Sequence, residues 1–250
     1  MNLSGKIMNS MEGFGVVLNK KTLFISDVHL GSRGSNPKEL FNLLNKEQPD
    51  TIFLVGDIID GWLLKKRFHW TKESTDVIRK LLAYSNKGTK VVYITGNHDD
   101  FLRAYSPSKF GNIEIVDEYE WNGYYITHGD LYDGVVQLKW LGIIGSYGYE
   151  LAIIIDRFFK KLGYKKSISK TLKDKVKGAV KFITNFEKQL AYQSYVRDCQ
   201  GIICGHIHKP DNKIIQVKDK EIHYLNCGDW IENNSYIEYK NSKFKLKKYE

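Results

Sequence analysis

The sequence predicts an α/β fold whose first half pairs its strands largely in parallel. Short apolar runs rich in β-branched residues, which are typical of buried strands, occur at 22–25, 51–55, 90–95, 124–127 and 201–204. Helical patterns at 37–47 and 74–88 separate the first three runs. Strand–helix–strand alternation of this kind favours a layered core with parallel pairing.

The two predicted helices carry recognisable ends. The first, PKELFNLLNKE, begins at Pro37, and proline is favoured in a first turn because its missing N–H has no partner to lose there. The second, STDVIRKLLAYSNKG, has Ser74 or Thr75 as its expected N-cap. Gly88 is its expected stop, since glycine readily adopts the left-handed conformation that ends helices.

The second half of the chain follows different patterns. From residue 211 onward, short strand runs alternate with turns, and the dipeptides at 218–219 and 241–242 suit hairpins, so antiparallel pairing is expected there. Residues 131–198 carry long helical patterns with no strand signal. We interpret them as a helical insertion in a single domain spanning 1–250, with residues 1–20 as an N-terminal extension.

Composition narrows the classes of protein. The 250 residues are 42% hydrophobic and 13% aromatic, which allows a sizeable core and argues against disorder. Three cysteines without a CxxC motif fit a reducing compartment such as the cytoplasm. The first residues contain no sustained apolar stretch, and no run of about eighteen apolar residues follows, so neither a secretory signal nor a membrane-spanning helix is expected.

A net charge of +9 points to an acidic partner, such as nucleic acid, anionic lipid or a phosphorylated substrate. Lysines crowd residues 160–181, although a solvated helix face is the simpler account of such a run. They follow the apolar stretch 140–159, which either packs on the core or offers an apolar groove for acyl chains. In a groove, the lysines near its polar end would be Lys165, Lys166, Lys170 and Lys173.

Polar residues follow each of the five strand runs. The last run precedes GHIHKP, whose two histidines would share a face if the strand continued. One such residue alone is usually a turn cap or a structural histidine. Five together, at the carboxyl ends where α/β sheets bind ligands, predict a functional site. These endings are D-x-H (Asp27, His29), GD (Asp57), GNHD (Asn97, His98, Asp99), HGD (His128, Asp130) and GHIH (His206, His208).

This order of motifs resembles the calcineurin-like metallophosphoesterase superfamily, and the resemblance runs from residue 22 to about residue 230. It implies a fold of two mixed β-sheets sandwiched between helices, with a helical cap insertion. GDIIDGW, the insertion and NCGDW (226–230) are similar to the group around UDP-2,3-diacylglucosamine pyrophosphatase. That group reads GNRD in the third motif, whereas this chain reads GNHD, the wider superfamily's usual form.

The resemblance implies two divalent metal ions. Asp57 would bridge them, because a carboxylate offers two oxygens. Imidazole, carboxylate and amide ligands suit Mn²⁺, Fe²⁺ or Zn²⁺, and the family favours Mn²⁺. One ion would be completed by Asp27, His29 and His208, and the other by Asn97, His128 and His206.

The same resemblance assigns the reaction. Two ions about 3.5–4 Å apart can activate water and clamp both oxygens of an in-line displacement at phosphorus. His98 is the expected catalytic residue that protonates the leaving oxygen, with Asp99 orienting its ring. Asp130 is a candidate supporting residue.

The leading hypothesis is therefore a cytoplasmic, metal-dependent phosphoester or pyrophosphate hydrolase acting on a nucleotide-linked lipid precursor such as UDP-2,3-diacylglucosamine. Peripheral contact with the inner face of an anionic membrane accompanies it. The alternative enzyme is a phosphodiesterase or phosphatase for a soluble nucleotide or other small phosphoester. A nucleic-acid-binding scaffold is the non-enzymatic alternative, suggested by the charge and by Trp62, Phe68 and Trp70, but no nucleic-acid-binding motif supports it.

Overall fold

The computed structural model describes residues 20–133 and 169–250, with the side chains of the long helix α5 described from residue 182 onward. The first described part contains β1 (Thr22–Ile25), α1 (Pro37–Lys46), β2 (Thr51–Val55), α2 (Gly61–Lys66), α3 (Lys72–Asn86), β3 (Lys90–Ile94), the 3-10 turn Asp100–Tyr105, β4 (Ser108–Phe110), β5 (Ile113–Val116), β6 (Glu118–Trp121), β7 (Tyr124–Thr127) and the 3-10 turn Asp130–Tyr132. The second contains α5 (Ser169–Val196), β8 (Gly201–Cys204), β9 (Asp211–Val217), β10 (Lys220–Asn226), β11 (Ser235–Lys240) and β12 (Lys243–Lys248).

The strands form two mixed sheets, which confirms the predicted fold class. A seven-stranded sheet has the order β12-β11-β1-β2-β3-β5-β4 and a five-stranded sheet the order β6-β7-β8-β10-β9. In the first sheet β1, β2, β3 and β5 are parallel neighbours, and the remaining pairs are antiparallel. In the second sheet β8 pairs in parallel with both β7 and β10, while β6 and β9 pair antiparallel at the two edges.

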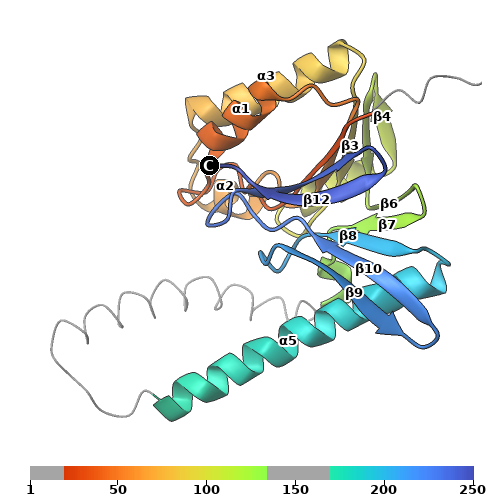
Figure 1. The fold of residues 1–250 in the computed structure, drawn as a ribbon. Helices are drawn as coiled ribbons and strands as arrows, with labels where there is room; N and C mark the ends of the chain where they lie inside the picture. Colours follow the sequence, from red (N-terminus) through yellow and green to blue (C-terminus); the bar gives the residue numbers. More distant parts are fainter. Residues whose placement is uncertain (1–19, 134–168) are drawn as a thin grey trace, which may run out of the picture.

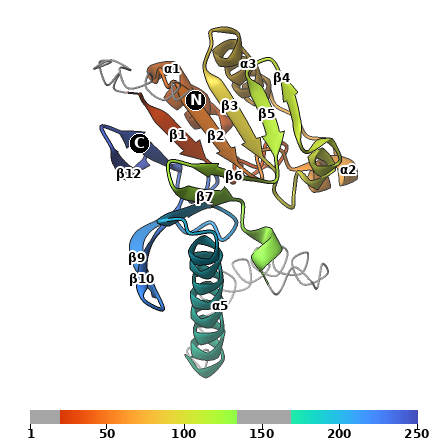
Figure 2. The same cartoon turned by 90° about the vertical axis from the view of Figure 1, so that its right-hand side faces the viewer.

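The elements are stacked in four layers (Figures 1 and 2). Helices α1 and α3 cover the outer face of the seven-stranded sheet, the two sheets face each other, and α5 lies on the outer face of the five-stranded sheet. Three apolar clusters fill the spaces between these layers. Along β1, Leu23 and Ile25 face the helices while Phe24 faces the second sheet. The strand runs are apolar throughout because both faces of each strand are buried.

Local signals explain most element ends, with one correction. The N-cap of α3 is Thr71, whose hydroxyl accepts from the Ser74 N–H, so the helix begins before the predicted cap at Ser74 or Thr75. Gly88 has φ +95° beyond the last turn, as expected of a helix stop. The predicted hairpins are present, and Asn241 and Ser242 both adopt positive φ, as the β11–β12 turn requires.

Sequence reasoning missed β4, β5, β6 and the short helix α2. The missed strands are three or four residues long and at most half-buried, so they lack the continuous apolar runs that revealed the others. The expectation of antiparallel pairing after residue 211 holds for the β9–β10 and β11–β12 hairpins and for the pairing of β11 with β1, whereas β10 also pairs in parallel with β8.

Several predicted features lie outside the described residues. These are residues 1–19 of the extension, the apolar stretch 140–159, and the side chains of Lys165, Lys166, Lys170 and Lys173. Within the predicted insertion 131–198, the described part of the chain places α5 at its carboxyl end. None of the helices that the structure describes has the length and apolar character needed to cross a membrane.

Candidate metal centre

The predicted site residues lie where β1, β2, β3, β7 and β8 end, at adjoining edges of the two sheets. Parallel register brings the ends of β1, β2 and β3 together, and the same holds for β7 and β8. Within each sheet, the Asp27 N–H donates to the Gly56 carbonyl and the Gly205 N–H to the His128 carbonyl, and between the sheets the His206 N–H donates to Asp27 Oδ2 at 3.0 Å. Loops from both sheets therefore meet around one centre.

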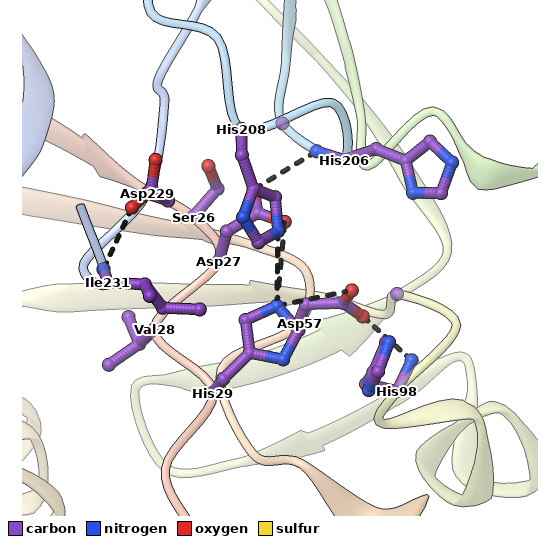
Figure 3. A network of polar contacts seen from close by, with 12 residues as sticks. Ser26, Asp27, Val28, His29, Asp57, His98, His206, His208, Asp229 and Ile231 are labelled. Atoms are coloured by element: carbon purple, nitrogen blue, oxygen red, sulfur yellow. Dashed lines mark hydrogen bonds and ion pairs between the residues drawn. The ribbon is translucent and has the colours of Figure 1, made fainter. Parts of the chain in front are cut away.

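The first group of side chains joins the loop after β1 to the loop after β8 (Figure 3). His208 Nε2 lies 3.1 Å from Asp27 Oδ1 and 3.3 Å from His29 Nε2. The three residues each offer a ligand atom, and these atoms lie within 4.8 Å of one another. The first group can therefore hold one metal ion.

The second group consists of Asp57, His128, His206 and Asn97. His128 Nε2 lies 3.2 Å from Asp57 Oδ2, and ligand atoms of Asp57, His128 and His206 lie within 4.8 Å of one another. Asn97 is buried and is flanked by Gly96 and His98, both of which approach the Asp57 carboxylate. Asp57 also faces the first group, because its Oδ2 is 3.8 Å from His29 Nε2. This carboxylate thus stands between the groups, as a bridging ligand would.

The two histidines of GHIH face different groups. The strand β8 ends at Cys204, and His206 and His208 both adopt left-handed φ values, 71° and 51°. The strand geometry that would have put both side chains on one face therefore does not extend to them. In Figure 3 the side chain of His206 points away from that of His208.

Hydrogen bonds leave one ring nitrogen of several histidines free to coordinate. The His128 Nδ1–H donates to the Val55 carbonyl at 2.9 Å, and His206 Nε2 lies 2.9 Å from an Asp133 carboxylate oxygen. His29 Nδ1 is likewise 3.3 Å from Asp60 Oδ2. An oxygen that accepts the proton of one nitrogen leaves the other with its lone pair, which is the form that binds metals.

Three buried atoms of the predicted ligands show that the residues fit metal ions. Asp27 Oδ1, Asn97 Oδ1 and His128 Nε2 make no hydrogen bond of acceptable geometry among the described residues, although Asp27 Oδ1 and His128 Nε2 lie at ion-pair distance from His208 and Asp57. Each contributes a lone pair, and leaving such a group unsatisfied costs about 1–3 kcal/mol. A divalent cation satisfies all three at once.

The backbone around the ligands is strained. A left-handed conformation costs a residue with a Cβ roughly 1–2 kcal/mol, and such strain concentrates at functional sites. Close approach adds a further constraint, because a Cβ on Gly96 would overlap Asp57 Oδ1 and one on Gly205 would overlap Asp27 Oδ2. The predicted ligands with positive φ are Asp27, His29, Asp57, His206 and His208.

His98 lies beside both groups but has a different carboxylate partner from the predicted one. Its Nδ1 is 3.1 Å from Asp60 Oδ1, and the Trp62 ring packs on it with centroids 4.4 Å apart. Asp99 is instead occupied by the Ile58 and Gly96 N–H groups and by the Tyr93 hydroxyl. The expectation that Asp99 orients the His98 ring is therefore wrong, and Asp60 takes that position.

A comparison with protein-family models identifies the fold family. The calcineurin-like phosphoesterase model matches residues 20–210. The chain belongs to the calcineurin-like phosphoesterase family. It is accordingly a metal-dependent phosphohydrolase.

Curated relatives of this phosphoesterase match over nearly its whole length. The UDP-2,3-diacylglucosamine hydrolase of Aliivibrio fischeri is 24% identical over 245 residues, covering 91% of this chain and 98% of the relative. The protein of the same name from Psychromonas ingrahamii is 27% identical over 240 residues, covering 90% and 96%. Among solved structures, the phosphoesterase YfcE from E. coli aligns with a TM-score of 0.44 at 13% identity, covering 92% of this chain and all of that one.

Sequence reasoning missed three acidic residues of the phosphoesterase site. Asp60 contacts His29 and His98, Asp133 contacts His206, and Asp229 accepts N–H groups of the loop that follows it. Asp60 and Asp229 lie within GDIIDGW and NCGDW, so the motifs contained a signal, whereas Asp133 had none. Asp130, the predicted supporting residue, pairs with Arg103 at 2.7 Å.

The buried carboxylates and histidines of the centre shift one another's pKa values. Burial would raise the pKa values of Asp27 and Asp57, but nearby histidines lower both. Burial would lower the pKa of His208, yet Asp27 raises it to about 9. His128 behaves similarly, since Asp57 and Asp27 raise its pKa well above the usual value against the effect of burial. Negative charge accumulates here and attracts cations, whether protons or metal ions.

Proposed function

We propose that this phosphoesterase uses two divalent ions, with Mn²⁺ as the native metal, to hydrolyse a pyrophosphate bond in a nucleotide-linked lipid precursor such as UDP-2,3-diacylglucosamine. The chemistry rests on one observation. The ligand atoms of Asp27, His29 and His208 and those of Asp57, His128 and His206 gather at the ends of five strands, the Asp57 carboxylate faces both groups, and buried Asp27, Asn97 and His128 atoms make no hydrogen bond of acceptable geometry among the described residues.

In this proposal each group holds one ion. Asp27, His29 and His208 serve the first position, Asn97, His128 and His206 serve the second, and Asp57 serves both. Bound divalent ions would polarise the phosphoryl oxygens and activate water for in-line attack. The protein's part is to hold its ligands in place, which the strained loops and the tautomer-fixing hydrogen bonds support.

His98 is placed to supply the proton for the leaving oxygen. Asp60 lies against its Nδ1, which leaves Nε2 as the nitrogen that can reach a substrate. Burial opposes protonation of His98, but Asp60 and Asp57 raise its pKa above the ordinary value, which favours the protonated form that a general acid needs. Asp60 and Trp62 position the ring from two sides.

The lipid-linked substrate rests on the relatives. Proteins named UDP-2,3-diacylglucosamine hydrolase match about nine-tenths of this chain from end to end, so the match includes the insertion as well as the metal motifs. We place the enzyme in the cytoplasm at the surface of an anionic membrane. Three free, buried cysteines and the +9 charge are compatible with that location.

A soluble phosphoester is the second candidate, and His98 favours it. The resembled group carries arginine at this position, and a guanidinium binds phosphate through a fork of donors that imidazole lacks. Histidine in place of arginine changes the residue that would face the leaving group. It therefore also changes the contacts that a diphosphate could make. The soluble candidates are nucleotides and phosphodiesters.

The experiment is a substrate comparison with the Mn²⁺-loaded full chain. UDP-2,3-diacylglucosamine, UDP-sugars without acyl chains, nucleotides and an aryl phosphodiester are supplied separately, and products are identified by mass. Release of UMP from the acylated substrate, at a kcat/KM at least tenfold above that for the sugar without acyl chains, supports the proposal. Faster turnover of a soluble phosphoester establishes the second candidate. His98→Ala is the inactive control for contaminating hydrolases.

A further inference from the structure

His206 is held by residues from both ends of the predicted insertion. Asp133 lies near the start of residues 131–198, and Phe186 belongs to α5 near their end. Asp133 Oδ2 is 2.9 Å from His206 Nε2, and the Phe186 ring centroid is 5.7 Å from that of His206. Of the ligands in the second group, His206 therefore depends on a segment outside the two sheets.

The contact with Asp133 determines which nitrogen of His206 can coordinate. A carboxylate can only accept, so Nε2 carries the proton and Nδ1 keeps its lone pair. Both partners are largely buried, with side-chain exposures of 12% and 6%, so the contact is little screened by water. A carboxylate behind a metal-bound histidine fixes the ring and makes it a stronger ligand.

Phe186 packs beside the His206 ring, with the two rings tilted relative to each other. Its side chain is 2% exposed and lies against Gly129, the residue after His128, where a Cβ would meet the ring. Leu190 and Ala191 continue this buried face of α5 onto the five-stranded sheet. The next residue, Glu187, forms an ion pair with Lys213 at 2.7 Å, which ties the same turn of α5 to β9.

We propose that Asp133 and Phe186 are positioning residues that couple the insertion to the second metal position through His206. The inference rests on the proposed two-metal function. The expected effect is confined to one metal position. A change in the contacts of the insertion with His206 alters metal affinity at the position of His128 and His206. Metal affinity at the position of Asp27, His29 and His208 stays unchanged. The insertion thereby acts on catalysis through metal occupancy.

The test is calorimetric titration of metal-free full-length protein with Mn²⁺. Wild type should bind two ions per chain, and His206→Ala identifies the step that belongs to the second position. Asp133→Asn, which keeps an acceptor but no charge, should weaken that step about 10-fold. Asp133→Ala should weaken it by up to about 100-fold, the range known for residues behind metal ligands. The other step should stay within twofold of wild type.

Asp198→Asn is the matched control, since it removes one carboxylate at the far end of the insertion, where Asp198 pairs with Lys220. Phe186→Leu provides a second variant, which should weaken the same step without removing charge. Unchanged affinities in Asp133→Ala, or equal loss at both steps, would overturn the inference while leaving the proposed function standing. A wild-type protein that binds fewer than two ions would remove the proposed function and the inference together.

Discussion

The two candidate metal positions are built from similar ligands but held by different parts of the chain. At the first, the Trp230 N–H donates to the Asp27 carbonyl, and the Asn233 side chain donates to the His208 carbonyl. Those donors belong to the loop between β10 and β11, two strands of the sheet core. At the second, His206 is held by Asp133 and Phe186 of the insertion.

The difference shows how one fold can keep a reaction while its substrate changes. Among the described residues, the Trp230 and Asn233 donors that hold Asp27 and His208 come from a loop between sheet strands, so we expect an altered insertion to affect the first position less than the second. At the second position, His206 contacts the insertion directly through Asp133 and Phe186. We therefore expect a changed insertion to adjust the second position, while the sheets keep the rest of the centre in place.

Asp57→Ala should have the largest effect on metal binding and hydrolysis, because it acts on both metal positions equally. The carboxylate lies between both groups, 3.2 Å from His128 Nε2 and 3.8 Å from His29 Nε2, so its loss removes a ligand from each. Elemental analysis should find well under two ions per chain, and hydrolysis should fall to background. Asp100→Ala serves as a control in the nearby 3-10 turn. Two ions retained at full occupancy would show that Asp57 is no bridge.

His98→Ala should separate catalysis from metal binding. The side chain is no ligand in the proposal, so both ions should remain bound. The rate should fall roughly 10²–10⁴-fold, the usual contribution of a positioned acid–base group. Asp60→Asn should give a smaller loss and lower the pKa governing kcat, since Asp60 helps to raise the pKa of His98. A His98→Ala enzyme with wild-type turnover would remove His98 from the mechanism.

The elements that the sequence predicts are those whose pattern lies within one short stretch of the chain. Strands such as β1 and β2 are buried on both faces, so continuous apolar runs reveal them, and a ligand, Asp27 or Asp57, follows two residues after each run. The grouping of Asp27, His29 and His208 against His128 and His206 followed from the family resemblance. The structure brings these residues together in the same two groups.

The unpredicted part depends on contacts between distant segments. His206 and Asp133 are 73 residues apart, and nothing in either segment's sequence announces the contact. The sequence predicts that Asp99 orients His98, yet the Asp99 carboxylate accepts from the Tyr93 hydroxyl, whereas Asp60 reaches His98 from the loop after β2. The strands β5 and β6 were not predicted, because charged residues interrupt their apolar runs.

Asp229→Asn should weaken the first position alone, as the counterpart of the Asp133 variants. Asp229 Oδ1 accepts three backbone N–H groups, which an amide oxygen can still do, but Oδ2 accepts from the Asn233 side chain that holds the His208 carbonyl. An amide NH₂ in its place would repel that donor. We expect about tenfold weaker Mn²⁺ binding at the step that His206→Ala spares. Glu232→Gln, an exposed change in the same loop, is the charge-matched control; loss at the His206 step instead would contradict the comparison.

The smallest effect should come from pH, and it should have opposite signs with and without metal. In the metal-free protein Asp27 raises the pKa of His208 to about 9, so its contribution to stability is complete below pH 6.5 and is lost as the pH rises through about 9. Asp27 itself has a lowered pKa and stays ionised throughout this range, so it adds no slope. Metal binding must displace the His208 proton, so Mn²⁺ affinity should rise by up to about tenfold per pH unit over the same interval.

Melting temperatures at pH 6.5 and pH 9 check both signs. The metal-free protein should melt lower at pH 9, while the stabilisation gained from a fixed Mn²⁺ concentration should be larger there. The effect is modest because 38% of the His208 side chain is exposed, so solvent screens its interaction with Asp27. His208→Gln should flatten the metal-free pH dependence, whereas His223→Gln should not, because burial lowers the pKa of His223 and keeps it neutral across this interval. A His208→Gln protein with an unchanged slope would assign the titration to the second position, where the pKa of His128 is also raised.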